Sequence, residues 1–326
     1  MRKINGFPSG ADDSASFLAQ LKERTQSPKR DDRRDAASMA HSKTEFELKL
    51  VGSARDVAAV PDFSPFEQIA AAPGAWDRLV STYYDSGDRR LDAAGISLRI
   101  REEAGIKTLT AKLTPRGGNA LLRLESERVL AGAARDFQTG CPEIDAVIDA
   151  SDGDLTPIAR TTTDRWSRLL HAGGALVEAS AEIGTAENIA EGRSAPIAEV
   201  ELELMKGDPA LLFDIAGQLI AGFDGRLRLS VEPKLDRALR AGAAFRLTKQ
   251  DRIAFSQDAA ACEVLRGALK QIAARVIEAA ALGAEAHDSE AARQLRVALR
   301  RLRAAERIFR KTAGGDELNL LAARAK

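Results

Sequence analysis

The sequence contains few of the residues from which metal sites and nucleophilic triads are usually built. Its two cysteines, Cys141 and Cys262, lie far apart and have no metal-ligand spacing, and its three histidines, His41, His171 and His287, are scattered. This scarcity argues against a histidine-based zinc site and against a serine–histidine triad.

An excess of one charge and a long apolar run are also missing. The 326 residues include 48 Lys and Arg and 48 Asp and Glu, so the formal net charge is zero and gives no indication of nucleic-acid binding. No signal peptide is evident, and no apolar run approaches the roughly 18 residues that a membrane-spanning helix needs. We therefore expect a cytoplasmic protein with neither a membrane nor a nucleic acid as its partner.

The most informative stretch is residues 45–49, Glu-Phe-Glu-Leu-Lys, in which charged and apolar residues alternate. This alternation predicts a strand over 43–51 with Glu45, Glu47 and Lys49 on one face and the apolar side chains on the other. Later segments repeat the pattern with charges of both signs. Further strands are expected at 82–85, 96–103, 108–113, 123–127, 161–170, 175–183, 198–205 and 226–231.

These segments amount to roughly eight strands of useful length, enough to close a barrel, and they predict an α+β fold built on a closed antiparallel eight-stranded β-barrel, a tunnel whose charged face points inward. Flanking helices at 134–150 and 208–221 would cover the outward apolar residues, and Pro233 with Lys234 would open a short polar segment. A charged lumen is costly unless it holds a ligand or a metal ion, so the pattern points to function. Salt bridges between neighbouring strands are the alternative explanation.

The two ends of the sequence differ from this middle part. Residues 1–40 are polar and carry a mixed-charge run at 29–35, which predicts a disordered tail, with Met39 as the expected biological start. Residues 41–250 would form the barrel domain. Residues 257–326 are rich in Ala, Leu and Arg and predict helices at 259–282 and 288–312, with a partial third at 316–325.

The second of these helices carries two stripes at helical spacing. The apolar stripe consists of Leu295, Leu299, Leu302 and Phe309, and the basic stripe consists of Arg293, Arg296, Arg300, Arg303, Arg307 and Arg310. A basic stripe is either a solvated helix face or a surface that binds a polyanion.

Taken in order, these residues resemble the CYTH family, also called triphosphate tunnel metalloenzymes. The Glu-x-Glu-x-Lys run at 45–49 is similar to the family's signature at the start of the domain. The further matching segments are Tyr83-Tyr84-Asp85, Leu91 to Gly95, Leu98 to Arg101, Thr110 with Lys112, Glu125 with Glu127, and Glu199 to Leu204. The resemblance covers about 41–250.

Residues 257–326 resemble the start of a CHAD domain, a helical module that often follows CYTH. The arginine-rich stretch at 294–303 carries this likeness. Arg293 stands where the CHAD pattern has a histidine, and a full CHAD module is much longer, so the segment would be a truncated one.

The resemblance implies a tunnel that holds a triphosphate and divalent cations. Lysine and arginine hold phosphate oxygens by charge-assisted hydrogen bonds, and carboxylates amid phosphates imply Mg²⁺ or Mn²⁺. The expected substrate-binding cations are Lys49, Arg99, Arg101, Lys112, Arg165 and Lys234. The expected metal ligands are Glu45, Glu47, Glu201 and Glu203, and Glu45, Glu47 and Lys49 form the catalytic signature. Further ligands, or groups that orient the lysines, would be Glu125, Glu127, Glu178 and Glu182.

We therefore expect a metal-dependent inorganic triphosphatase that hydrolyses tripolyphosphate to diphosphate and phosphate, with cations that neutralise the phosphates and activate water. The family also contains adenylate cyclases and thiamine-triphosphatases, which read the same triphosphate. A different class of function is a non-catalytic polyphosphate-binding module that combines the barrel and the basic stripe.

Overall fold

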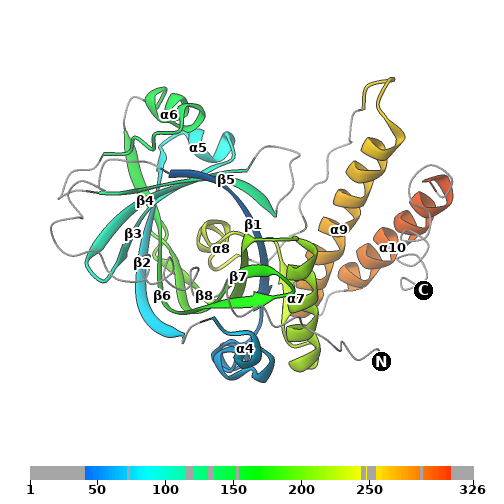
Figure 1. Cartoon of the computed structure of the whole chain (residues 1–326). Coiled ribbons are helices and arrows are strands. Elements are labelled where there is room, and N and C mark those ends of the chain that lie inside the picture. The colour runs from blue at the N-terminus through cyan, green and yellow to red at the C-terminus, as the bar shows by residue number, and fades with distance from the viewer. Residues whose placement is uncertain are drawn as a thin grey trace.

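The centre of the computed structural model is a closed antiparallel β-barrel (Figure 1). Its strands are β1 (His41–Val51), β2 (Ala75–Ser86), β3 (Ile96–Glu103), β4 (Ile106–Leu113), β5 (Leu122–Val129), β6 (Leu155–Ala172), β7 (Ala175–Asn188) and β8 (Arg193–Lys206). They follow one another in the order β5-β4-β3-β2-β6-β7-β8-β1, and β1 pairs with β5 to close the ring. The predicted eight-stranded barrel is confirmed, although β2 and β6 are longer than the sequence predicts.

The structure describes residues 41–71, 74–114, 121–130, 136–151, 154–243, 247, 255–286 and 289–309. The predicted tail at 1–40, including Met39, and the predicted helix at 316–325 lie outside these residues, as does Arg310.

Strand β1 pairs with different partners along its length. Its residues 41–46 pair with β5, and residues 47–51 pair with β8. A short strand, β9 (Arg228–Ser230), pairs with residues 49–51 on the side that β5 leaves free. Glu45 is therefore paired with β5, Glu47 is paired with β8, and Lys49 lies between β8 and β9.

Several helices surround the barrel. They are α3 (Ala54–Ala58), the 3₁₀ helix η1 (Val60–Asp62), α4 (Ser64–Ile69), α5 (Arg90–Ala93), α6 (Pro142–Asp149) and α7 (Ala210–Gly222). Helix α7 begins where the sequence predicts, because the Asp208 carboxylate accepts a hydrogen bond from the Ala210 amide at 2.9 Å. Helix α6 is shorter than its predicted range and starts with Pro142 in its first turn.

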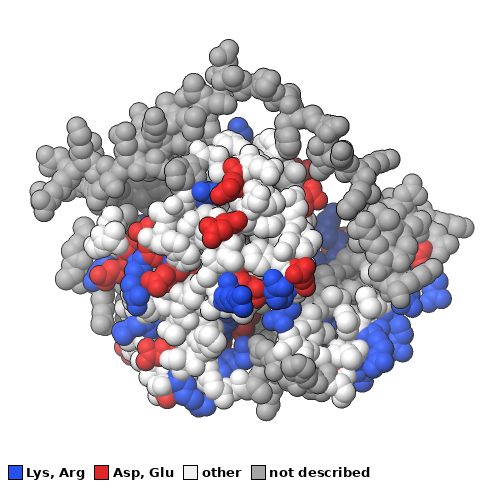
Figure 2. Space-filling view, turned by 90° about the horizontal axis from the view of Figure 1, so that it is seen from below, with Lys and Arg blue, Asp and Glu red and all other residues white. Residues whose placement is uncertain are grey.

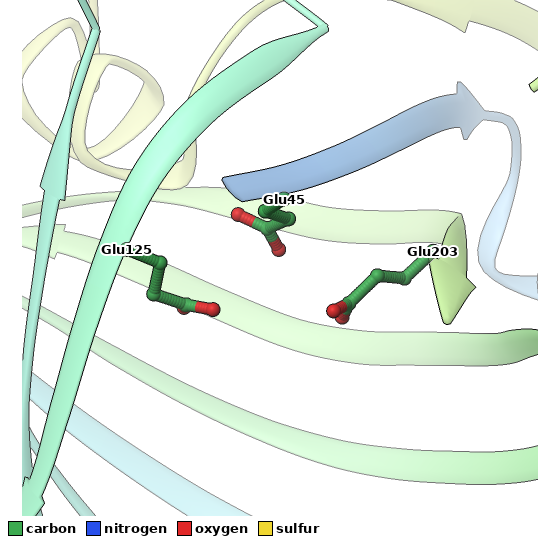
Figure 3. Close-up of side chains that lie close together, drawn as sticks. All are labelled: Glu45, Glu125 and Glu203. Carbon is green, nitrogen blue, oxygen red and sulfur yellow. The ribbon is translucent and has the colours of Figure 1, made fainter. Parts of the chain in front are cut away.

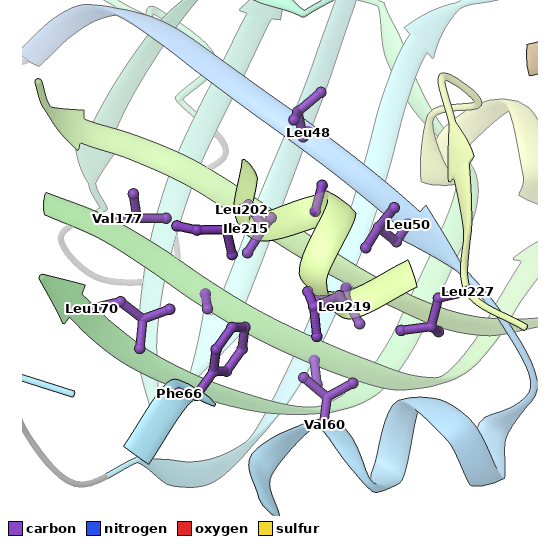
Figure 4. Close-up of a cluster of buried hydrophobic side chains, with 14 of the residues drawn as sticks. Leu48, Leu50, Val60, Phe66, Leu170, Val177, Leu202, Ile215, Leu219 and Leu227 are labelled. Atoms are coloured by element: carbon purple, nitrogen blue, oxygen red, sulfur yellow. The ribbon is translucent and has the colours of Figure 1, made fainter. Parts of the chain in front are cut away.

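The outer faces of the strands form the hydrophobic core together with these helices. Leu48 and Leu50 of β1 pack with residues of β6, β7 and β8 against α3, α4 and α7, with Phe66 and Leu219 among the buried contacts (Figure 4). On the other side of the barrel, β3 and β4 pack in the same way against α5 and α6. The expected cover by the helices near 134–150 and 208–221 is thus present, with α3, α4 and α5 in addition.

One helix lies within the ring of strands (Figure 1). This helix, α8 (Lys234–Leu239), contacts β6, β7 and β8. Its Leu235 and Ala238 are buried against Tyr83, Ala159 and Ile197. The sequence predicts only a short polar segment here, and the structure corrects this, because the lumen is apolar where these strand residues face inward.

The C-terminal part forms a helical pair, α9 (Ala261–Ala286) and α10 (Ser289–Phe309). The contact between them uses Ala298, Ala305, Leu302 and Phe309 of α10, whereas Leu295 is only half-buried. The small alanines allow close approach, so the buried seam is shifted from the predicted leucine stripe.

Basic side chains gather on the side of the molecule where α9 and α10 lie (Figure 2). Among the described helices, none combines the length and the apolar character of a membrane span.

Candidate active site inside the barrel

A cavity of about 820 Å³ occupies the barrel lumen. Side chains alternate across a strand, so the charged positions of neighbouring strands converge on this space. Every candidate site residue from the sequence lines it, namely Glu45, Glu47, Lys49, Arg99, Arg101, Lys112, Glu125, Glu127, Arg165, Glu178, Glu182, Glu201, Glu203 and Lys234. The structure therefore brings all of them into one site.

Two buried lysines form one part of the site. The Lys49 ammonium lies 3.2 Å from carboxylate oxygens of both Glu199 and Glu201. The Lys234 ammonium, from the first residue of α8, lies 2.7 Å from Glu199 and 2.8 Å from Glu201, and 3.1 Å from Glu182. The two lysines thus share the same carboxylates, and β8 and α8 are held together through them.

A second part of the site is a group of carboxylates from three strands. Glu45 of β1, Glu125 of β5 and Glu203 of β8 point toward one another (Figure 3). One oxygen from each lies within 4.8 Å of the other two. Lysines neutralise this carboxylate cluster. The Lys112 ammonium lies 2.7 Å from Glu45 and 3.2 Å from Glu125, and the Lys43 ammonium lies 2.6 Å from Glu203.

Arginines line the remaining wall. Arg99, Arg101 and Arg165 come from β3 and β6, and their buried Nε atoms form no hydrogen bond within the described part of the chain. A buried donor without a partner is costly, so these groups are prepared for an acceptor that enters the lumen. Arg165 also bonds Glu178 at 3.0 Å through its Nη2.

The remaining carboxylates orient neighbouring groups. Glu127 accepts a hydrogen bond from the Thr110 hydroxyl at 3.2 Å, and Glu182 accepts one from the Thr163 hydroxyl at 3.1 Å. These contacts fit the expected role of orienting groups, and they hold the side chains against the wall.

Burial and neighbouring charges divide the glutamates into two kinds. Burial alone would raise the pKa of Glu201, but the charges of Lys234 and Lys49 hold its pKa well below the usual range. In contrast, burial raises the pKa of Glu47, and the nearby charge of Glu201 adds to this rise. Burial likewise raises the pKa of Glu203, although Lys43 opposes it. Glu47 and Glu203, directly paired across β1 and β8, would therefore gain from an added cation.

The cluster of Glu45, Glu125 and Glu203 fits a hard divalent cation. Its donors are all oxygens, and an octahedral Mg²⁺ with bonds of about 2.1 Å spaces its ligand oxygens by roughly 3 to 4.2 Å. Small side-chain rotations would bring the three carboxylates to that spacing. Glu47 lies beside the cluster, with an oxygen 3.9 Å from the Lys112 ammonium. Glu201, also expected as a ligand, is instead held by the two buried lysines.

Lys43, Glu199 and Arg237 contribute to the site, although none of them was predicted as a site residue. Lys43 shares the inward face of β1 with Glu45, and Glu199 shares the inward face of β8 with Glu201, so the period of two could have revealed both. Arg237 of α8, which lies 3.6 Å from Glu199, has no such signal because it depends on where α8 packs.

The protein-family comparison agrees with this geometry. The model of the CYTH domain matches residues 43–239, which is more than half of the chain. The chain belongs to the CYTH family. The match ends at the last residue of α8, so the likeness of 257–326 to a CHAD domain stays an expectation.

Three solved structures show distant similarity to this CYTH protein. A suspected adenylate cyclase from Bacillus halodurans is 17% identical, with 56% of this chain and 91% of that chain covered and a TM-score of 0.39. A Hippeastrum protein described as having a dominant triphosphatase activity is 15% identical, with 61% and 96% covered and a TM-score of 0.39. The Mimivirus capping enzyme triphosphatase is 8% identical, with 66% and 98% covered and a TM-score of 0.35. Likeness at this level assigns no reaction, and the comparison with curated proteins gave no match.

Proposed function

We propose that this CYTH protein is a metal-dependent inorganic triphosphatase, which hydrolyses tripolyphosphate to diphosphate and phosphate. The observation that supports this most directly is the pairing of two features in one lumen. Arginine Nε donors that have no hydrogen-bond partner among the described residues face the same cavity as a carboxylate cluster that fits a divalent cation. A ligand with several negative charges and an associated cation would satisfy both.

The cations of the tunnel would bind and orient the substrate. Arg99, Arg101 and Arg165 offer planar donors, which match phosphate oxygens well. Lys112, Lys49 and Lys234 are fixed by carboxylates, so they present charge without losing much conformational freedom when the substrate binds. This preorganised field would stabilise the charge on the transferred phosphoryl group.

The carboxylates would hold the metal and position water. Glu45, Glu125 and Glu203 are the ligands that the geometry favours, with Glu47 beside them. Bound Mg²⁺ or Mn²⁺ would supply charge neutralisation at the phosphates and lower the pKa of coordinated water.

The decisive experiment is phosphate release from tripolyphosphate by the full chain, with and without Mg²⁺ or Mn²⁺. We expect turnover with the metal ion, loss of turnover in excess chelator, and recovery when the metal is restored. Full activity in excess chelator would contradict the proposal. The same assay with ATP and thiamine triphosphate separates the other activities of the family, since cyclic AMP or thiamine diphosphate would appear as products.

A second candidate, a polyphosphate-binding module, is supported by α10. Its arginines 293, 296, 300, 303 and 307 are exposed. This surface and the tunnel are compatible with inorganic triphosphate or polyphosphate as the partner. Binding of long polyphosphate without release of phosphate would favour this candidate.

A further inference from the structure

Lys43 contacts the carboxylate cluster without being part of the charged signature at 45–49. Its ammonium lies 2.6 Å from a Glu203 oxygen and 3.4 Å from a Glu125 oxygen. Two of the three carboxylates that fit a divalent cation are therefore already bonded to the same positive charge. The third, Glu45, is bonded to Lys112 instead.

The two lysines of the cluster differ in how firmly they are held. The Lys112 side chain is 18% exposed, whereas that of Lys43 is 46% exposed. A half-exposed lysine keeps much of its hydration and can turn its four-carbon chain toward solvent, so its ion pairs exchange more easily than those of a more buried lysine. Lys112 lies deeper, between Glu45, Glu47 and Glu125.

We propose that Lys43 is a displaceable counter-ion of the metal centre, which stabilises the carboxylate cluster while no divalent cation is bound and leaves it when one binds. This inference rests on the proposed function, because it takes the cluster of Glu45, Glu125 and Glu203 as the metal site. A divalent cation held by Glu203 and Glu125 would lie close to the Lys43 ammonium, which these two carboxylates hold at 2.6 and 3.4 Å, so the two positive charges would repel each other and compete for the same carboxylates.

Two consequences follow for the chain. In the absence of a metal, the Lys43 ammonium offsets the repulsion between Glu203 and Glu125, so these carboxylates can lie close together. The same contact lowers the affinity for a divalent cation, because the ion has to compete with an ammonium that belongs to the chain. Lys43 thus tunes the affinity of the carboxylate cluster for a divalent cation.

The test is Mn²⁺ binding to the full chain without substrate, measured by calorimetric titration or by the electron paramagnetic resonance of free Mn²⁺. Lys43→Met removes the charge and keeps the chain length. We expect Mn²⁺ to bind this variant roughly tenfold more tightly than the parent chain, as removal of one nearby, partly screened positive charge predicts. Lys43→Arg, which keeps the charge, should stay close to the parent.

Lys107→Met is the matched control. Lys107 is exposed to a similar extent, at 48%, and its nearest acidic partner is Glu102 at 3.9 Å rather than the cluster. It changes the net charge by the same amount, so its Mn²⁺ affinity should equal that of the parent. If Lys43→Met binds Mn²⁺ with the affinity of the parent, or more weakly, the counter-ion role of Lys43 is contradicted, whereas the proposed metal site is still supported. If neither chain binds Mn²⁺, the inference and the metal dependence of the proposed function are both wrong.

Discussion

Individual side chains in the tunnel depend on the charges placed next to them. Glu45 is paired with Lys112, and Glu201 is paired with Lys49 and Lys234. These ammonium groups, rather than bulk water, offset most of the charge of the two carboxylates. A substitution that keeps shape and removes charge therefore tests function without opening a cavity.

The first prediction concerns the carboxylate cluster. Glu45→Gln and Glu203→Gln should reduce tripolyphosphate hydrolysis by roughly 100-fold or more, because loss of even an outer partner of a metal ligand costs 10–100-fold. The fold should persist, since Glu125 still pairs with Lys112 at 3.2 Å. Initial rates with Mg²⁺, together with circular dichroism, provide the measurement. Glu67→Gln, at an exposed position of α4, is the control and should behave as the parent.

The second prediction concerns the arginine wall. Arg99→Ala and Arg101→Ala should raise KM and lower kcat, because the same donors contact the substrate and the transition state. Lys112→Ala should behave similarly, and Arg101→Lys should lie between alanine and the parent, as lysine lacks the planar fork. Steady-state kinetics with tripolyphosphate measure this. Unchanged kinetics in both alanine variants would show that these arginines do not contribute to substrate binding or catalysis.

At the level of secondary-structure elements, α8 connects stability with the site. Its first residue provides the Lys234 ammonium, and its next residue, Leu235, is packed against Tyr83 and Ile197 inside the barrel. The position of the lysine therefore depends on an apolar contact, which links packing to substrate binding.

The third prediction follows from this link. Leu235→Ala should lower the free energy of unfolding by about 2 kcal/mol, near the low end for a buried leucine because its side chain also borders the cavity. It should also raise KM by loosening Lys234. Chemical denaturation and steady-state kinetics give the two values. Phe213→Ala, on the exposed face of α7, is the control and should change neither.

The fourth prediction concerns α9 and α10. A chain ending at residue 248 should keep triphosphatase activity, because no residue of these helices lines the cavity in the described structure. It should lose retention on a polyphosphate matrix, because the exposed arginines of the basic stripe are no longer present. The comparison is made at low salt, since salt screens exposed charges. An inactive short chain would place the helices within the catalytic fold, and undiminished retention would make the basic stripe a solvated face only.

For the whole molecule, the interior ion pairs predict how stability depends on pH. The pKa of Glu182 and that of Glu201 lie below the usual value of 4.5, because Lys234 and other cations outweigh burial. A carboxyl with a depressed pKa in the folded state adds stability above pH 4.5, and this stability disappears as the pH falls toward the folded-state pKa.

The fifth prediction is therefore a fall in Tm as the pH decreases below about 4.5. The plot of Tm against pH should be less steep for Glu201→Gln, which has no carboxylate to protonate at this position. Thermal unfolding between pH 7 and pH 3, without metal ions, measures it. The exposed Glu67→Gln variant should retain the parental slope. Equal slopes in Glu201→Gln and the parent would show that the nearby lysines do not lower the pKa of the Glu201 carboxyl.

The barrel and most of its inner face could be predicted from local sequence. Alternation at 45–49 and 199–204 specifies both the strand and the side of each charge, because the period of a strand is two. The helices α6 and α7 were detectable from their prolines. Helix α8 was not recognised, because its six residues carry few signals and their burial depends on Ala159, Tyr83 and Ile197 far away in the sequence.

What the sequence by itself determined is the list of charges and the strand face on which each lies, since alternation is a local property. Only the tertiary structure decided which charges meet. It places Glu45 and Glu203 close to Glu125, and it pairs Glu201 with Lys49 and Lys234. The register between strands distant in sequence fixes such pairings, and it depends on packing around the whole barrel.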